Sequence, residues 1–282
     1  MNIPIAPLSQ AQRGVRSVKH LLEVWCCGGG RQSCAIAVAI IQGKLPKPDL
    51  AVMADTGRER FTTIPYLSKY VIPGLEAVGV KLEIVKASEW GYYGERYVDG
   101  SGDLMLPVYT LENGIAGKNM PDCSGAWKRD TINHWLSKTH GITRSQFCKW
   151  IGFSRSPKEL IRASRMQKSV KEGGKKSRFP LIELGLNTYE CLQLVKAHGW
   201  PEPKVSACWM CPNLKDSERI ELSDEEKRLA IEFDREVRAQ FPGSFLHGEC
   251  HPLEEIELSR SNDLFTDTNL KADGCETGGC FV

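Results

Sequence analysis

The stretch LLEVWCCGGGRQSCAIAVAII, from Leu21 to Ile41, decides the fold of this 282-residue chain. Its apolar start, which ends at Trp25, is typical of a short buried strand, and the small apolar residues from Cys34 onward indicate a helix. The three glycines between them let backbone N–H groups approach a ligand closely, and the start of the helix adds partial positive charge. This order predicts a cradle for nucleotide phosphates. The turn matches neither GxxxxGK(S/T) nor GxGxxG, however, and a plain tight connection would have the same glycines.

Apolar and amphipathic segments alternate after this stretch. We expect a strand over Leu50 to Ala54, a helix over Phe61 to Ala77 and a strand over Lys81 to Val85. Alternating strands and helices indicate βαβ units, so the expected fold is α/β, with an open, mostly parallel twisted sheet flanked by helices. Because ligands gather at the carboxyl ends of the strands in such a sheet, Asp55 to Gly57 are expected beside the glycine turn.

A CxxC pair, Cys208 and Cys211, is followed by Pro212 in the segment SACWMCP. This tight spacing suits metal binding by thiolates, but a redox pair or a structural turn can have the same spacing. One CxxC supplies two ligands, and a closed metal site needs four. Cys250, which His251 follows, is one candidate for a further ligand.

Three segments, together with the glycine turn, carry a resemblance to a known family. In chain order they are DTG at 55–57, DCSGAWKR at 122–129 and SACWMCP at 206–212. From about Leu21 to about Asp216, the chain resembles the adenine-nucleotide alpha-hydrolase superfamily, also called the PP-loop ATP pyrophosphatases, whose fold is HUP-like. It is most similar to the branch of the phosphoadenosine-phosphosulfate (PAPS) reductases. Three motifs are similar to a phage and bacterial subgroup of that branch: IGFS at 151–154, RFPLIE at 178–183 and YEC at 189–191.

The resemblance implies that the glycine turn and the DTG segment bind an adenine nucleotide, either ATP with Mg²⁺ or a sulfonucleotide such as PAPS or adenylyl sulfate. The turn departs from the SGGxDS pattern of the ATP pyrophosphatases, because Cys27 replaces the first serine and Gln32 the aspartate. Glutamine is closer to the GIQ loop of the PAPS reductases, and it removes one carboxylate partner for Mg²⁺. Lys128 and Arg129 are expected to stabilise charge at the alpha-phosphate or the sulfate. The expected nucleotide-binding residues are Cys27, Gly28, Gly29, Gly30, Arg31, Gln32, Ser33, Asp55, Thr56 and Gly57.

The resemblance also implies a metal centre. Cys123 and Cys191 would join Cys208 and Cys211, with Cys250 as the rival for the fourth position. Ligation by thiolates alone fits either a [4Fe–4S] cluster or zinc. The cluster is favoured, because adenylyl-sulfate reductases and the PP-loop enzymes that thiolate DNA and tRNA use iron–sulfur.

The C-terminal segment GCETGGCFV, at 274–282, offers a thiol on a glycine-rich tail. PAPS reductases carry their nucleophilic cysteine near the C-terminus in an ECG(I/L)H motif. Cys280, or else Cys275, has a similar place here without that motif. The catalytic hypothesis is that Cys280 swings to the site and carries sulfur, and the alternative is an inert tail.

Positive charge is concentrated in one segment, although the net charge is only +2. Residues 144–178 hold eleven Lys or Arg and two Glu. Such a stretch is either a solvated face or a surface for phosphates, those of a nucleic-acid backbone or the 3′-phosphate of PAPS. Trp127, Trp135 and Trp150 are candidates for stacking on bases, and the alternative is that they belong to the core.

Composition and segment boundaries suggest the organisation of the whole chain. We expect an N-terminal arm at 1–20, a nucleotide-binding domain at 21–222, a helical extension at 223–260 and a flexible tail at 261–282. Ser223 and Glu226 form the pattern of a capping box at the start of the extension. Eleven cysteines without a secretory signal favour the cytoplasm, and no apolar stretch is long enough for a membrane span.

Three functions are compatible with these features. The favoured one is an ATP-dependent, adenylating enzyme that transfers sulfur to a nucleic acid, with a cysteine desulfurase as a possible sulfur donor. The alternative is a reductase of PAPS or adenylyl sulfate, with thioredoxin as its partner. The third is a nucleotide sensor without catalysis, which the missing aspartate at position 32 supports. The family resemblance also implies a possible homodimer.

Overall fold

A computed structural model describes residues 21–92, 94, 96–171 and 176–259. The predicted N-terminal arm and the predicted tail with Cys275 and Cys280 lie outside the described residues. Within the described chain, no helix has the length and apolar character that crossing a membrane requires.

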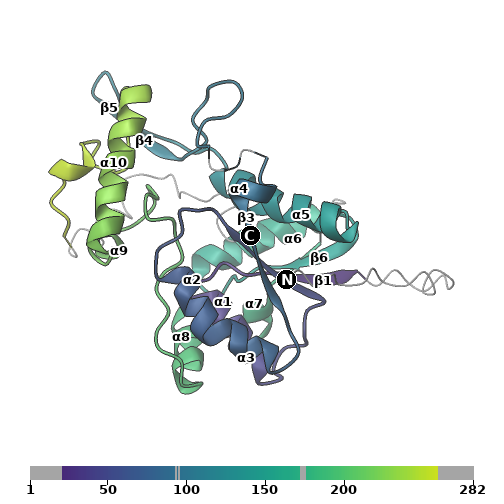
Figure 1. The fold of residues 1–282 in the computed structure, drawn as a ribbon. Helices are drawn as coiled ribbons and strands as arrows, with labels where there is room; N and C mark the ends of the chain where they lie inside the picture. The colour runs from purple at the N-terminus through teal and green to yellow at the C-terminus, as the bar shows by residue number, and fades with distance from the viewer. Residues whose placement is uncertain (1–20, 93, 95, 172–175, 260–282) are drawn as a thin grey trace.

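The central element is a five-stranded sheet in which every pair of neighbouring strands is parallel (Figure 1). Its order is β3-β2-β1-β6-β7. Helices follow most strands, so the predicted α/β class with an open parallel sheet is confirmed. The strands are β1 (Leu22–Cys26), β2 (Leu50–Asp55), β3 (Leu82–Lys86), β6 (Phe147–Trp150) and β7 (Ser177–Arg178).

Both faces of the sheet are covered, which explains why its strands are apolar without strict alternation. Trp25 packs on one face with α1 (Arg31–Ile41) and α8 (Thr188–Ala197), in the largest core cluster. Val24 and Cys26 point to the other face, where α5 (Asp130–His140) contributes Ile132 and Leu136. The shorter segments around this core are α2 (Thr63–Tyr66), the π-helix η2 (Leu67–Val71), α3 (Ile72–Glu76), α4 (Ala87–Trp90), the π-helix η3 (Gly125–Arg129), α6 (Pro157–Lys171) and α7 (Pro180–Glu183).

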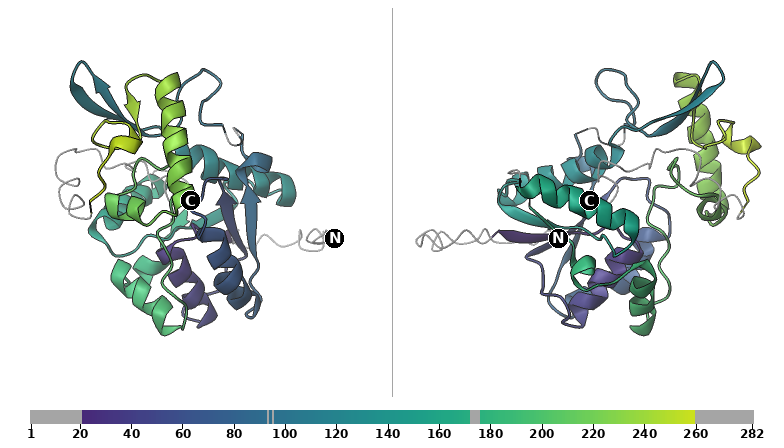
Figure 2. Two further views of the ribbon diagram at one scale, coloured as in Figure 1. Left: turned by 60° about the vertical axis from the view of Figure 1, so that its left-hand side comes forward. Right: turned by 180° about the vertical axis from the view of Figure 1, so that it is seen from behind.

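A second, smaller body is built on an antiparallel sheet of order β5-β4-β8. In all three views it lies at one end of the molecule together with α10 (Figures 1 and 2). The predicted helix after Ser223 is confirmed, since Ser223 and Glu226 form the capping box of α10. The sheet joins segments from both sides of the predicted boundary at residue 222. Its elements are β4 (Val108–Glu112), β5 (Ile115–Asn119), β8 (Ser244–Phe245), α9 (Asp216–Ile220), α10 (Asp224–Gln240) and the 3-10 turn η4 (Leu253–Glu255).

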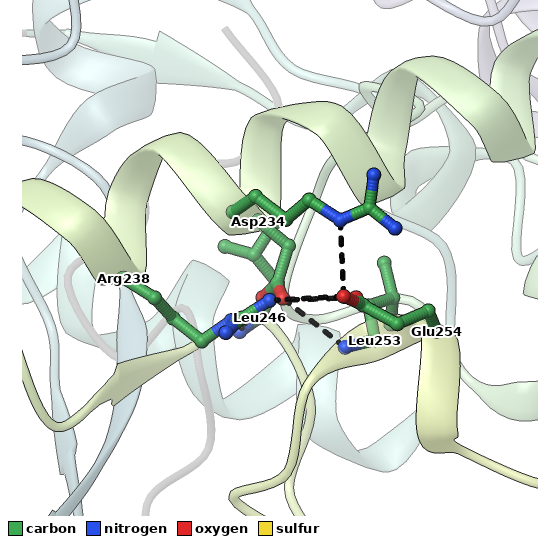
Figure 3. Close-up of polar contacts among 6 residues, drawn as sticks. Asp234, Arg238, Leu246, Leu253 and Glu254 are labelled. Carbon is green, nitrogen blue, oxygen red and sulfur yellow. Dashed lines mark hydrogen bonds and ion pairs between the residues drawn. The ribbon is translucent and has the colours of Figure 1, made fainter.

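A buried carboxylate fixes the chain that follows β8 onto α10 (Figure 3). Asp234 has no exposed surface; its two oxygens accept from Leu246 N and Leu253 N, each at 3.1 Å. Arg238 donates to the same carboxylate at 2.8 Å and also pairs with Glu254 at 3.3 Å. Asp234 therefore satisfies backbone donors that packing would otherwise leave unpaired.

Candidate active site

The glycine turn is held between the ends of β1 and β2 and the start of α1. Cys27 N donates to the backbone of β2 at 2.8 Å, and Ser33 Oγ accepts from Gly28 N at 2.8 Å. Gly29 has a φ of +75°, and a Cβ there would lie 2.6 Å from the side chain of Thr63. Conformation and packing both require glycine at position 29. Cys27 itself is buried in the main core, where burial raises its pKa to about 11.

A small cavity opens where α1 begins. Gly30 is the N-cap, and the described residues provide neither a side-chain cap nor an acidic residue for the first turn. The first N–H groups of a helix have no acceptor within it, so they and the partial positive charge of the helix suit phosphate oxygens. The residues lining the cavity are Cys26, Gly28, Gly30, Gln32, Ser33 and Gly152.

Four of these six residues belong to the predicted nucleotide set. The prediction missed Cys26 and Gly152. Gly152 follows β6, which pairs with β1, so the parallel sheet brings it to the turn from a distant part of the sequence. The IGFS motif contains Gly152, but nothing in that motif indicates that Gly152 lies beside the glycine turn.

Residues 201–207, which we call the strap, cross the glycine turn. Ser206 Oγ donates to Gly28 O, and a Cβ on Gly30 would lie 2.8 Å from Ser206 Cβ. Arg31 pairs with Glu202 on the strap at 3.0 Å and donates to Pro203 O at 3.4 Å. The predicted phosphate partner Arg31 is therefore directed at the strap rather than into the cavity, because a carboxylate is available there.

The DTG segment forms a tight turn at the end of β2. Asp55 Oδ1 accepts from Gly57 N at 2.9 Å, and Gly57 has a φ of +73°. Thr56 is buried, donates to Glu59 at 3.1 Å and lies 3.6 Å from Cys208 Sγ. The expected position beside the glycine turn follows from the pairing of β1 with β2.

The CxxC segment docks directly on the residues after the DTG turn. Trp209 N donates to Arg58 O at 3.0 Å, and Arg60 N donates to Ala207 O at 3.2 Å. These bonds place Cys208 opposite Glu59 in an antiparallel bridge. The glycine turn, the DTG turn and the CxxC are thus parts of one continuous structure.

Cys123, Cys208 and Cys211, which we call the thiol trio, share one partly buried region. Burial raises the pKa of Cys123 to about 12, and the neighbouring Cys211 adds to the shift. Burial likewise raises the pKa of Cys208 and that of Cys211. Without a metal, these thiols are therefore protonated at neutral pH.

Lys128 lies beside the trio and is neutralised by Glu59. The two side chains are 12% and 2% exposed, and Lys128 Nζ is 2.8 Å from Glu59 Oε1. Burial alone would lower the pKa of Lys128, but Glu59, followed by Cys208 and Cys123, raises it. Of the predicted catalytic residues, Lys128 is thus brought to the thiols.

Arg129 faces a different cavity. It pairs with Asp122 at 2.8 Å and with Asp130 at 3.0 Å. All three line a cavity of about 600 Å³, which Asp99 and Asp103 also line, on the side of the small sheet. Arg129 does not line the cavity at the glycine turn, because its neighbouring carboxylates hold it elsewhere.

The structure does not bring the remaining predicted cysteines to the trio. Cys191 lies on α8 and packs in the main core against α1. Cys250 is buried, and its Sγ lies 3.7 Å from Thr110 O on β4. Among the described residues, no three His, Cys, Asp or Glu side chains form a group that could hold a metal ion. Thiols are the donors that zinc and iron–sulfur clusters prefer, but the described residues do not arrange the trio as a metal site.

Part of the basic segment stacks on the core rather than facing solvent. The guanidinium of Arg178 lies 4.8 Å from the ring centre of Trp150, which is buried. Trp127 and Trp135 are buried as well, so the three tryptophans belong to the core. Exposed basic side chains remain along α6 and just before it: Arg155, Lys158, Arg165 and Lys168.

Arg219 is a buried residue next to the CxxC that the prediction missed. It is 2% exposed, and its Nη2 donates to Cys211 O at 3.0 Å and to Leu246 O at 2.6 Å. Burial lowers the pKa of Arg219, and Cys211 is the largest influence in the opposite direction. No sequence pattern marked it, because it lies on a short charged helix.

Comparison with known proteins gives little further information. No family model matches the chain, and no curated protein does. Among solved structures, the chain is similar to the U34-tRNA thiolase NcsA from Methanococcus maripaludis with its [4Fe-4S] cluster. The two are 14% identical with a TM-score of 0.39, over 93% of this chain and 78% of that chain. A likeness this weak carries no argument about the chain.

Proposed function

We propose that this protein is an adenine-nucleotide-dependent sulfur transferase that acts on a nucleic acid. The observation that carries the proposal is the joining of two chemistries in one structure. Thr56, at the end of β2, lies 3.6 Å from Cys208, and Ser206 of the strap bonds the glycine turn. A nucleotide held by the turn and sulfur held by the thiol trio would therefore be neighbours.

The residues of the turn have the donors for a nucleotide phosphate. Gln32 and Ser33, in the first turn of α1, line the small cavity, and no carboxylate of the described chain lines it. Asp55, on the neighbouring strand end, is a candidate Mg²⁺ partner in place of the aspartate missing at position 32. We expect Arg31 to exchange Glu202 for a phosphate when the nucleotide binds.

The proposed reaction has two redox-neutral steps. A carbonyl oxygen of a base attacks the alpha-phosphorus of ATP, and pyrophosphate leaves with Mg²⁺. Hydrosulfide then attacks the carbon of the activated base, the carbon–oxygen bond breaks, AMP leaves and a proton goes to solvent. A metal held by thiols of the trio would supply a binding place for sulfide, which requires these cysteines to adopt an arrangement that the described residues do not show.

The acceptor is proposed to be a nucleic acid because of the basic surface on α6. This helix follows β6, whose end contributes Gly152 to the phosphate cavity. Exposed Arg165 and Lys168 therefore lie on the element that follows the proposed nucleotide site, and exposed Arg155 lies just before it, where a phosphate backbone would bring a base close.

The test is an anaerobic assay with Mg-ATP, radiolabelled sulfide and either total RNA or genomic DNA. We expect pyrophosphate release that depends on the nucleic acid, with label retained in it. Cys208→Ser should abolish labelling, whereas Cys148→Ser, a cysteine on β6 away from the trio, should not. Sulfite release from PAPS without pyrophosphate, or nucleotide binding without turnover, would contradict the proposal.

A further inference from the structure

The outer face of α6 carries two exposed apolar side chains among cations. Leu160 and Ile161 are 38% and 54% exposed, and of the large hydrophobic residues exposed in the described chain, these two alone are neighbours in sequence. A single exposed hydrophobic residue is ordinary on a protein surface. Here the two form an apolar spot on a helix whose Lys158, Arg165 and Lys168 are exposed as well.

Helical spacing brings Ile161 and these cations onto one stripe of α6. Positions three or four residues apart lie on the same face of an α-helix. At about 1.5 Å per residue, Lys158 and Arg165 are about 10 Å apart along the helix axis, and Ile161 lies between them. Three stacked base pairs, at about 3.4 Å each, have a similar length. The stripe consists of Lys158, Ile161, Arg165 and Lys168.

The opposite side of α6 is fixed to the body of the protein. Ala163 is buried and packs in one cluster with Phe153. Glu159, the one acidic residue in the sequence of α6, is 8% exposed and accepts from Ser154 N and Ser156 Oγ, each at 2.9 Å. Within the described helix, the exposed face therefore carries cations without a carboxylate, on a support that is held in place.

A basic face with an apolar spot suits three classes of partner, of which the structure favours a nucleic acid. A membrane-bound helix inserts a broad apolar face, whereas the apolar side of α6 is buried against the protein. A protein interface covers about 800 Å² per partner and has few lysines at its centre, whereas this spot has two apolar side chains and lysines around it. A nucleic acid offers phosphates to the cations and a stack of bases to the apolar spot.

We propose that Leu160 and Ile161 form a wedge that inserts between stacked bases of a paired nucleic acid. This inference rests on the proposed function, in which a base must leave its stack before its carbonyl oxygen can attack ATP. Leucine and isoleucine are among the side chains that proteins insert between base steps. The cations on the stripe would hold the phosphates on both sides of the opened step. The substrate class is thereby a duplex or a hairpin, of DNA or of RNA.

The test measures unstacking without assuming a target sequence. Full-length protein is mixed with total RNA or genomic DNA and treated with permanganate, which oxidises thymine and uracil rings that have left the stack. Sequencing maps the oxidised positions, and the RNA and DNA arms distinguish the two sources. The test variant is Leu160→Gln/Ile161→Gln, because glutamine keeps a high helix propensity. Tyr189→Gln, which alters an exposed aromatic residue on α8, is the matched control.

We expect the wild type and Tyr189→Gln to raise permanganate reactivity at discrete positions within paired segments. The double variant should open such positions at least about tenfold less often, because it cannot compensate the cost of unstacking. Its affinity for single-stranded poly(U) should match that of the wild type, since its cations are intact. Arg165→Gln should instead reduce the slope of binding against salt concentration by about 1 for every nucleic acid.

The outcomes separate the wedge from the proposed function. Wild-type reactivity in the double variant, or an equal loss of poly(U) binding, would overturn the inference, and so would a wild type that binds without opening base steps. A protein that binds phosphatidylserine vesicles but no nucleic acid contradicts both proposals. A wild type that opens base steps but releases no pyrophosphate contradicts only the proposed function. If circular dichroism shows that the double variant does not fold, the reactivity given by Ile161→Ala decides instead.

Discussion

Replacing Glu59 by Gln should strongly destabilise the fold, because it removes the partner of a buried lysine. Glu59 is 2% exposed and Lys128 12%, and Glu59 also accepts the hydroxyl hydrogen bond of Thr56. Breaking one side of a buried ion pair costs about 3–5 kcal/mol, since the remaining charge stays buried without compensation. The Lys128–Glu59 ion pair also joins the turn after β2 to η3. We therefore expect both segments to become less stable when the pair is broken.

The assay is urea unfolding of the full-length protein, with the slope m checked so that a change in midpoint reports stability. Glu225→Gln is the matched control: it breaks an exposed pair with Arg228, and no measurable loss is expected. The double variant Glu59→Gln/Lys128→Met should recover much of the loss, because no charge is left buried. A single Glu59→Gln variant within about 1 kcal/mol of the wild type would show that the pair is not buried as described, since breaking a buried pair costs more.

The site gives three further expectations. Gly30→Ala should lower the free energy of unfolding by about 1–3 kcal/mol, because the new Cβ would lie 2.8 Å from Ser206 Cβ. It should also weaken ATP binding measured by calorimetry. An ATP affinity equal to that of the wild type would contradict the packing of the strap on the turn. The metal-free protein should lose stability as pH rises from about 9 to about 12, because the pKa of Cys123 is raised from 9.0 to about 12 in the folded state and the unfolded thiol ionises first. Denaturant titrations should show this fall, and a metal-loaded protein, whose thiolates are already ionised, should not. Cys191→Ala should keep its metal while Cys208→Ser loses it, as metal analysis would show; equal losses would restore Cys191 as a ligand.

The local structure was largely predictable from the sequence. The strand, glycine turn and helix from Leu21 onward are confirmed, because each is encoded by neighbouring residues and by their burial on both faces of a sheet. The helix after Ser223 is confirmed for the same reason, since its capping box is local. The predicted helix over 61–77 is present as three successive segments, one of them a π-helix that amphipathic periodicity does not distinguish.

The partners of the site residues were not predictable, because they come from distant parts of the chain. Arg31 bonds a carboxylate 171 residues away, and nothing in the glycine turn marks Glu202 as its partner. Cys191 has the same chemistry as the trio, yet its place on α8 buries it against α1. Residue type indicates what a side chain can bind, whereas the topology decides which side chains meet.

The strap has a consequence for how the protein becomes active during synthesis. Ser206 and Gly28, which bond each other, are 178 residues apart, so closing the site requires a very long loop. A nascent chain that has emerged only as far as β3 can form the βαβ unit with the glycine turn, but it lacks the strap and the CxxC. Contacts of such long range form late and slow folding. The proposed nucleotide site and the CxxC are therefore completed together, after about three quarters of the chain has been made, and we expect an unfinished chain to lack the proposed activity.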